Sequence, residues 1–356
     1  MYAVFTTGGM IVDNVVSFDG TVHQGTLGGN GVYSAAGANL WLGQVGIVAV
    51  VPSNYPSQWL DAIRNAGIDT AGITAREASV ECSEWFFYRS DGSRVDGLHA
   101  EKGFFEACGF KSDQLTPEQS ARFQERLQKR KSNGLDFSEF RRLHPVRAID
   151  IPGAYLDRGV HIAPGPTDAQ HDLLLNLRVP GRVITLDPGS YATDIRTGSW
   201  PVMLPLLDAL LPSEKELLVM APGRSHANGL ALLRSAGVPI AGVKLGAAGA
   251  LIDDGSRSGP AAVPTLSVDA VDPTGAGDAF CGGFLAGLMS TGNALCATLC
   301  GTVAASFAVQ SYGPFGLFSA SQEEVIHRWR SLAKTCDLPN AETLLSQLRA
   351  MRLPHR

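Results

Sequence analysis

Short apolar runs alternate with amphipathic stretches through the part of the chain that follows Pro152. The apolar runs predict strands, and the amphipathic stretches predict helices between them. The expected strands are Val160–Ala163, Val183–Asp187, Glu216–Val219, Ile240–Leu245 and Ala250–Asp253, and the expected helices are Gln170–Leu177, Met203–Leu211 and Ala227–Ala236. This alternation is typical of the α/β class, with a doubly wound, mainly parallel sheet flanked by helices.

The N-terminal third adds short strands that do not fit within such a sheet. Two Asp-Gly pairs, which are strong turn signals between apolar runs, predict hairpins over Asn14–Thr26 and Cys82–Leu98. We expect these hairpins to form a small β lid, from about residues 13–27 and 82–98. The other elements expected here are strands at Tyr2–Thr6 and Gln44–Val51, a helix of small residues from Gly31 to Leu42, and a helix at Ser57–Ala66 closed by Gly67.

The first arm of the second hairpin, Trp85–Tyr88, is aromatic on both faces. Such a strand is either covered by its own chain or closes over a ligand. Because it cannot leave both faces in water without a large apolar patch, we also expect a possible homodimer through the lid.

Residues 111–150 change in character and predict a helical insertion. Thr116–Gln119 is a capping box with Pro at the first helical position, and Gly134 can end that helix. We interpret its basic residues as a solvated helix face rather than a polyanion site, because the run is short. The segment Ser321–Arg356 predicts two helices that separate near Pro339, and we treat residues 1–356 as one domain.

A formal net charge of −5 gives the chain no basic footprint for nucleic acid or for a lipid surface. With 45% hydrophobic and 18% charged residues it can bury a large core, which excludes global disorder. The 6 cysteines contain no C-x-x-C pair, so we expect free thiols in a reducing cytoplasm. We expect neither a secretory leader nor a membrane span, because Asp13 and Asn14 interrupt the first apolar stretch and no long uncharged apolar window follows.

The segment Asp272–Asp278 carries the clearest chemistry. The small residues Gly275, Ala276 and Gly277 let successive backbone N–H groups point outward, and the apolar run after them predicts a helix whose positive end faces the same way. Such a turn binds an anion. Asp278 stands beside it and can accept a proton from an attacking hydroxyl. The alternative is an ordinary helix-capping Asp after a glycine turn.

Three further segments are each ambiguous alone. Thr26–Gly31 precedes the small-residue helix and is either a close-approach backbone site or an ordinary glycine turn. Leu211–Glu216 places acids where a strand should begin, which by itself is more often a solvated turn. Val243–Ala250 is a strand ending in a glycine loop, where open α/β sheets bind ligands, or a plain hairpin into Ala250–Asp253.

Together, and in this order, the four segments resemble the PfkB family of carbohydrate kinases, which has the ribokinase-like fold. The resemblance runs from about Tyr2 to about Phe318. Asp272–Asp278 matches the specific family signature D-x-T-G-A-G-D, whereas the matches at Gly28-Gly29 and Leu245-Gly246 are looser. The resemblance implies that ATP, with Mg²⁺, phosphorylates a hydroxyl of a small sugar or sugar-like polyol.

The resemblance also implies roles for single residues. Asp278 matches the catalytic base, and the N–H groups of Gly275, Ala276 and Gly277 match the anion hole for the transferred phosphoryl group. The implied substrate-binding residues are Asp13, Gly28, Gly29 and Asn30, with Tyr33 beside them, and the implied nucleotide-binding residues are Lys244, Leu245, Gly246, Thr274 and, more weakly, Gly313. Glu216 matches an acid associated with Mg²⁺ and phosphate through water.

Three departures from the family pattern concern the substrate more than the chemistry. Ser213 stands where the family's N-x-x-E motif has Asn, and residues 111–150 are longer than usual. Tyr33 stands where many sugar kinases have Asn, which removes an amide and adds a ring on which a sugar or a base could pack. We therefore expect a polyhydroxy substrate other than plain ribose.

Two alternatives stay open: a nucleoside kinase of the same fold, and a catalytically silent sugar-binding regulator, against which the retained Asp278 argues. The sequence lacks the glycine motifs of dinucleotide oxidoreductases and of P-loop kinases, which argues against both classes.

Overall fold

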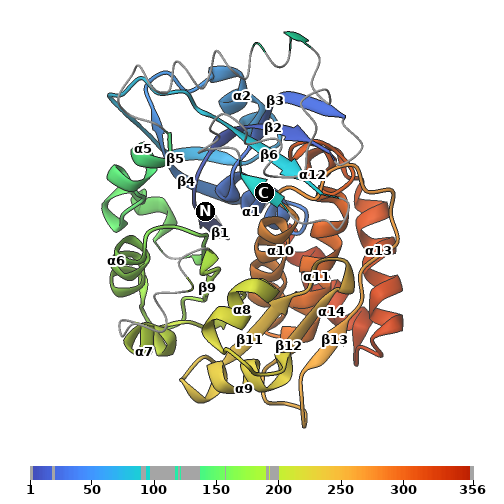
Figure 1. Cartoon of the computed structure of the whole chain (residues 1–356). Coiled ribbons are helices and arrows are strands. Elements are labelled where there is room, and N and C mark those ends of the chain that lie inside the picture. Colours follow the sequence, from blue (N-terminus) through green and yellow to red (C-terminus); the bar gives the residue numbers. More distant parts are fainter. Residues whose placement is uncertain are drawn as a thin grey trace.

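The computed structural model describes residues 3–17, 21–89, 94–96, 117–118, 121, 137–156, 158–189, 192 and 200–352. Figure 1 shows a central sheet between two groups of helices, with a smaller sheet at one end.

Among the described residues, nine strands form the central sheet, in the order β13-β12-β11-β10-β9-β8-β1-β4-β5. The strands are β1 (Val4–Thr7), β4 (Val45–Pro52), β5 (Asp69–Arg76), β8 (Gly159–Ile162), β9 (Ile184–Leu186), β10 (Ala209–Leu210), β11 (Ile240–Lys244), β12 (Ala250–Asp253) and β13 (Ala261–Val263). All neighbours from β5 to β11 pair in parallel, and β12 and β13 pair antiparallel at the edge. The predicted mainly parallel α/β sheet is confirmed.

Helices cover both faces of this sheet. One face is covered by α1 (Asn30–Asn39), α10 (Ala276–Thr291) and α11 (Ala294–Ala308), and the other by α6 (Thr167–Leu177), α8 (Glu214–Met220) and α9 (His226–Ser235). Successive strand residues alternate between the two cores: Val4 belongs to the first and Phe5 to the second. The remaining helices are α2 (Ser57–Asn65), α5 (Phe137–Leu143), α7 (Trp200–Met203), α12 (Phe315–Ser319), α13 (Gln322–Thr335) and α14 (Ala341–Arg352), with 3₁₀ turns at 148–150, 153–155, 204–206 and 246–248.

Small residues let α1 lie directly against α10. A side chain on Gly282 of α10 would overlap the backbone of Ser34 on α1. Both helices begin at the end of the molecule where the smaller sheet lies (Figure 1). The small residues predicted to bring α1 close to a sheet therefore also bring it close to a second helix.

The smaller sheet is the predicted lid. Its order is β3-β2-β6-β7, with β2 (Ile11–Val16), β3 (Val22–Gly28), β6 (Ser83–Tyr88) and β7 (Arg94–Asp96). Antiparallel pairs β2–β3 and β6–β7 are joined by a parallel β2–β6 pair, so the two predicted hairpins form one sheet. The predicted turns at 18–20 and 90–93 lie outside the described residues.

The aromatic strand β6 is covered by its own chain. Trp85, Phe86, Phe87 and Tyr88 are all buried. A second subunit is therefore not needed to shield this strand. The homodimer through the lid stays a prediction, but the need to cover the aromatic strand no longer supports it.

Two sequence-based assignments are wrong. Glu216–Val219 belongs to helix α8 rather than to a strand, because Ser213 and Glu216 form a capping box that starts the helix. Met203–Leu211 is not one helix: α7 ends at Met203, a 3₁₀ turn follows, and β10 occupies Ala209–Leu210. Strand β5 was not predicted at all.

The predicted insertion is described only in part. The helix expected from Thr116 to Gly134 lies almost wholly outside the described residues, whereas α5 at its end is described. The two C-terminal helices are confirmed as α13 and α14. In the part of the chain that the structure describes, no helix has the length and apolar composition needed to cross a membrane.

Candidate active site

Residues of the candidate site, among them the predicted Lys244, lie at the carboxyl ends of the parallel strands. Gly8 follows β1, Pro164 follows β8, Asp187 follows β9, Ser213 follows β10 and Lys244 ends β11. This edge is where open α/β sheets bind ligands. The lid sheet and the start of α10 lie at the same end of the molecule (Figure 1).

The turn before α10 has the geometry of an anion site. Gly275 is the N-cap with φ 74°, a left-handed conformation that a residue with a side chain would adopt at a cost. Among the described residues, no partner takes the N–H groups of Gly275, Gly277 and Asp278, as expected in the first turn of a helix. The N–H of Ala276 differs, since it donates to Pro273 O at 3.3 Å.

Asp278 is half-buried in this first turn. Burial raises the pKa of its carboxyl to about 6; Asp187 adds to the rise, and Lys244, Arg94 and Arg141 oppose it. A carboxyl with a pKa near neutrality is suited to take a proton from a hydroxyl. The alternative interpretation, a helix-capping Asp, gains no support, because Gly275 is the N-cap and no side-chain capping bond is made at this helix start.

Lys244 links the end of β11 to the anion turn. Its Nζ makes an ion pair with Asp187 and lies 3.5 Å from Cys281 Sγ. A side chain on Gly277 would come within 3.7 Å of the same Nζ. Burial alone would lower the pKa of Lys244, but Asp187 raises it above its ordinary value. The ammonium group therefore stays charged beside the amides that would hold a phosphate.

Glu216 lies near this ion pair but is also a helix cap. Its Oε2 accepts a hydrogen bond of 2.7 Å from the N–H of Ser213. Burial, followed by the charge of Asp187, raises the pKa of Glu216 to about 7. Among the described residues no group of three His, Cys, Asp or Glu side chains forms a metal cluster. Two neighbouring carboxylates fit a Mg²⁺ ion held mainly by phosphate and water.

Asp13 lies at the bulge in β2, where burying its carboxylate charge carries a free-energy cost. The residue is 1% exposed, and neither carboxyl oxygen has a hydrogen-bond partner among the residues that the structure describes. Burial first, and then Asp272 and Glu84, raise the pKa of Asp13 well above its ordinary value. A side chain on Gly28 would overlap this carboxyl group, so the two predicted residues do lie together. Hydroxyl groups of a ligand would supply the missing hydrogen bonds.

Asn30 holds three loops together. Its Oδ1 accepts a bond of 2.6 Å from the N–H of Gly9, and its Nδ2 donates to Pro164 O at 3.0 Å. Gly29, with φ 105°, packs on the carbonyl of Gly9. Both residues therefore shape the wall of the site, and the amide of Asn30 is already engaged within the chain.

Tyr33 fills the space between the two halves of the site. Its ring covers Gly275, where a side chain would overlap it, and its side chain is 1% exposed. The ring therefore offers no open stacking face, unlike the predicted platform. Its buried hydroxyl has no hydrogen-bond partner within the described part of the chain. Burial first, and then Asp13, raise the pKa of Tyr33.

The lid touches the anion turn through one hydrogen bond. Tyr88 Oη and Thr274 Oγ1 are 2.7 Å apart, and Thr274 Oγ1 donates to Asp272 Oδ1 at 2.6 Å. Burial raises the pKa of Tyr88 to about 12. The hydroxyl of Thr274, predicted to bind nucleotide, is therefore engaged with the lid.

The remaining predicted nucleotide residues lie apart. Leu245 and the exposed Gly246 form the turn between β11 and β12. These two strands pair as an antiparallel hairpin, which was the simpler of the two interpretations of this segment. Gly313 packs on the lid, because a side chain there would meet Thr26 Oγ1 at 2.6 Å. Their binding roles stay predictions.

Sequence reasoning missed Asp187, Tyr88 and Arg141. Asp187 carried a usable signal, an acid at the carboxyl end of a predicted strand in an α/β chain. Tyr88 was noted only as part of an aromatic strand. Arg141 carried no signal, because its place beside the site depends on how the insertion folds back.

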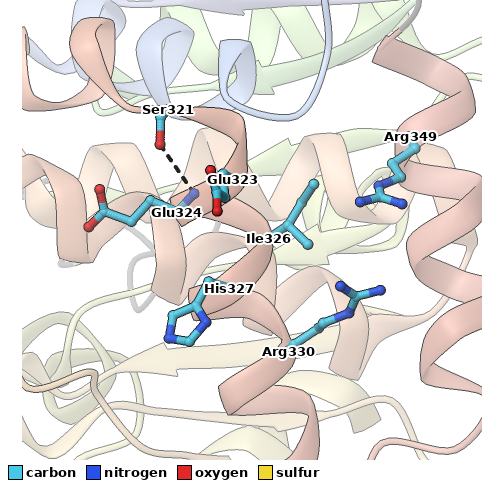
Figure 2. A pocket seen from close by; sticks show the side chains of 7 residues that line it. All are labelled: Ser321, Glu323, Glu324, Ile326, His327, Arg330 and Arg349. Carbon is cyan, nitrogen blue, oxygen red and sulfur yellow. Dashed lines mark hydrogen bonds between the residues drawn. The ribbon is translucent and has the colours of Figure 1, made fainter.

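A hollow of about 690 Å³ lies elsewhere, over α13 and α14 (Figure 2). Ser321 Oγ accepts the N–H of Glu324 at 3.2 Å, and Arg330 donates two hydrogen bonds to Glu342, at 2.9 and 2.8 Å. The first contact is a helix cap and the second is an exposed ion pair, both of which are typical of a solvated surface.

Comparisons with known proteins show that this sequence is similar to carbohydrate and nucleoside kinases. Residues 189–317 match the model of the pfkB family carbohydrate kinases. A cytidine kinase from Thermococcus kodakarensis is 27% identical over 292 residues, which are 81% of this chain and 88% of that protein. The resemblance drawn from the sequence motifs is confirmed.

Solved structures match across nearly the whole chain. A putative ribokinase II from E. coli, in complex with ATP and Mg²⁺, is 21% identical with a TM-score of 0.66, over 93% of this chain and 100% of that one. A nucleoside kinase from Methanocaldococcus jannaschii, described as an archaeal member of the ribokinase family, is 16% identical with a TM-score of 0.61, over 93% and 99%. The ribokinase-like fold is confirmed.

Proposed function

We propose that this chain, which has a PfkB carbohydrate kinase domain at residues 189–317 and the ribokinase-like fold, transfers the γ-phosphoryl group of ATP to a sugar hydroxyl. The observation that carries the proposal is the position of Asp278. A carboxyl with a pKa near 6 stands in the same helix turn as unpartnered N–H groups. The first suits a proton acceptor and the second an anion.

In the proposed reaction the acceptor oxygen forms a bond to the γ-phosphorus, and the bond from that phosphorus to the β-phosphate oxygen breaks. Asp278 takes the hydroxyl proton as the oxygen attacks. The N–H groups of Gly275 and Gly277 hold the transferring phosphoryl oxygens, with Lys244 as the adjacent positive charge. The turn at Leu245 and Gly246 borders the nucleotide, and Gly313 and Thr274 close that side through the lid.

Glu216, with Asp187 nearby, would hold Mg²⁺ through water and phosphate oxygens. The ion would neutralise charge on the phosphates during transfer. The E. coli structure with ATP and Mg²⁺ supports this cofactor set by its fold similarity.

The acceptor binds at Asp13, whose two unpartnered oxygens suit hydroxyl groups. A free sugar or polyol other than ribose is the first candidate. A nucleoside is the second, favoured by the similarity to a cytidine kinase. Both present the hydroxyls that Asp13 requires.

The test is ADP release with Mg²⁺ and ATP over a panel of sugars, sugar acids and nucleosides. The wild type should turn over at least one acceptor, and Asp278→Asn should lower kcat by about 10²–10⁴-fold while ATP still binds. The acidic limb of kcat/KM should fall near pH 6, because only deprotonated Asp278 accepts the proton.

A silent regulator would bind a panel member without releasing ADP. An Asn variant that keeps more than about a third of the wild-type kcat would reduce Asp278 to a structural role, against the loss expected for a general base.

A further inference from the structure

Arg141, on α5 at the end of the insertion, reaches the wall of the candidate site. A side chain built on Gly9 would lie 3.0 Å from Arg141 Cζ and 3.1 Å from its Nε and Nη2. The guanidinium group therefore lies on the bare backbone of Gly9. The N–H of Gly9 in turn donates to Asn30 Oδ1, and Gly9 packs on Gly29, which places the arginine on the acceptor side of the site.

Arg141 is also within electrostatic range of the proposed base. Its charge opposes the rise in the pKa of Asp278, as do the charges of Lys244 and Arg94, whereas Asp187 adds to that rise. Lys244 is held by Asp187, and the guanidinium of Arg94 lies 4.4 Å from the centre of the Phe86 ring.

Arg141 differs from its neighbours in having no partner among the described residues. Arg142 pairs with Glu139 at 3.7 Å, and Arg147 pairs with Asp168. Arg141 makes no hydrogen bond, ion pair or ring contact with any residue that the structure describes. A half-buried guanidinium group carries five N–H donors and is costly to leave without acceptors.

We propose that Arg141 binds the acceptor and selects those that carry, away from the attacking hydroxyl, a group accepting paired hydrogen bonds. This inference rests on the proposed function and narrows its substrate class. A guanidinium group donates and never accepts, and its two parallel N–H groups match a planar edge. The carbonyl oxygen and the ring nitrogen N3 of cytidine, which are both acceptors, present such an edge, and so does the carboxylate of a sugar acid; an unsubstituted sugar does not.

The experiment compares Arg141→Met with Arg142→Met, its exposed neighbour on the same helix. The acceptors are cytidine, gluconate and fructose, and each KM is measured with KM for ATP. Arg141→Met should raise KM about 10–100-fold for whichever of cytidine and gluconate the wild type uses, as for hydrogen bonds to a charged group. KM for ATP and all constants of Arg142→Met should stay near wild type.

Two readouts separate binding from a merely structural role. Guanidinium ion added to Arg141→Ala should restore part of the lost rate, and the acidic limb of kcat/KM should move to higher pH in Arg141→Met, because a positive charge beside Asp278 is gone. Neither effect should appear in Arg142→Met.

Gly9→Ala gives an independent route to the same contact. The added methyl group must shift the guanidinium group by a few tenths of an ångström while leaving its charge in place. It should raise the acceptor KM in the wild-type background and have little further effect in Arg141→Met, which is the non-additivity expected of residues in contact.

The outcomes distinguish this inference from the proposed function. A wild type that phosphorylates no acceptor overturns the function itself. A wild type that is active, with Arg141→Met equal to Arg142→Met on its best acceptor, overturns only the role of Arg141. Fructose as the best acceptor, with unchanged KM in Arg141→Met, overturns it as well.

Discussion

Asp13 and Asp278 are both carboxylic acids with raised pKa values, but their surroundings give them different tasks. Asp278 lies beside Lys244 and two arginines, whose charges hold its pKa near 6 against burial. Asp13 has acidic neighbours and no hydrogen bond to either oxygen. Asp278 is therefore suited to exchange a proton during turnover, and Asp13 to be satisfied by a bound hydroxyl.

Asp13→Ala should raise KM for the acceptor by a factor equivalent to about 1.5–3 kcal/mol, the range for hydrogen bonds to a charged group. KM for ATP should barely change, because Asp13 belongs to strand β2 of the lid, whereas Lys244 ends β11 of the central sheet. Steady-state kinetics with each substrate varied in turn measures both constants.

Asp13→Asn is the matched control. Its amide keeps hydrogen-bonding capacity while removing the buried charge, so its acceptor KM should lie between those of the wild type and Asp13→Ala. If Asp13→Ala leaves both KM values unchanged, the carboxyl group serves only the bulge in β2.

At the scale of elements, the start of α8 combines a structural and a chemical role. Ser213 and Glu216 cap the helix reciprocally, so Glu216 is needed whether or not a metal is present. Glutamine also serves at this capping position, which allows the charge to be removed without the cap.

Glu216→Gln should raise the Mg²⁺ concentration that gives half the maximal rate. Since burial raises the pKa of Glu216 to about 7, the wild type should need less Mg²⁺ as pH rises through 7, and the variant should lose that dependence. Mg²⁺ titrations of ADP release at several pH values measure both effects.

Glu214→Gln provides the comparison, because Glu214 lies in the same helix turn and its Oε1 pairs with His226 Nε2 at 2.9 Å. Its Mg²⁺ requirement should stay that of the wild type. Equal effects of the two substitutions would remove Glu216 from the proposed Mg²⁺ site.

The elements that sequence predicted well are those with local signals. The helix α2 has amphipathic spacing and a closing glycine, and Gly67 indeed has φ 82°. The Ser213–Glu216 capping box is equally local, but it was interpreted as the start of a strand because the apolar run after it is short. Strand β5 was missed because half of its residues are only partly buried at the sheet edge, which blurs the two-residue period.

The candidate site also contains residues that local sequence motifs predicted and contacts that they did not predict. The anion turn, Asp278 and the Asp13–Gly28 pair follow from motifs whose residues are close in sequence or matched by family resemblance. The Tyr88–Thr274 contact spans 186 positions along the chain, and the approach of Arg141 to Gly9 joins segments that share no sequence pattern. Such contacts depend on tertiary packing, which a single sequence does not encode locally.

At the scale of the whole molecule, the lid and the anion turn are joined by the Tyr88–Thr274 hydrogen bond. Tyr88→Phe should lower kcat/KM for the acceptor about two- to tenfold, the effect of losing one neutral hydrogen bond. Loss of the bond should loosen lid closure and leave ATP affinity close to that of the wild type.

Tyr55→Phe is the control for this change. Tyr55 is buried, and its hydroxyl has no partner among the described residues, so removing it should not slow the reaction. Kinetics and thermal melts of both variants provide the comparison; a Tyr88→Phe enzyme as fast as Tyr55→Phe would show that the hydrogen bond does not control closure.

The close packing of α1 on α10 at Gly282 has a consequence for how this scaffold can diversify. The two helices that carry Tyr33 and Asp278 cannot slide or separate without loss of backbone contact, so the site of bond formation is fixed. Other parts of the candidate site, at Asp13 on β2, Tyr88 on β6 and Arg141 on α5, lie outside that helix pair. Substitutions or length changes in those parts can alter acceptor preference while the transfer geometry is inherited intact.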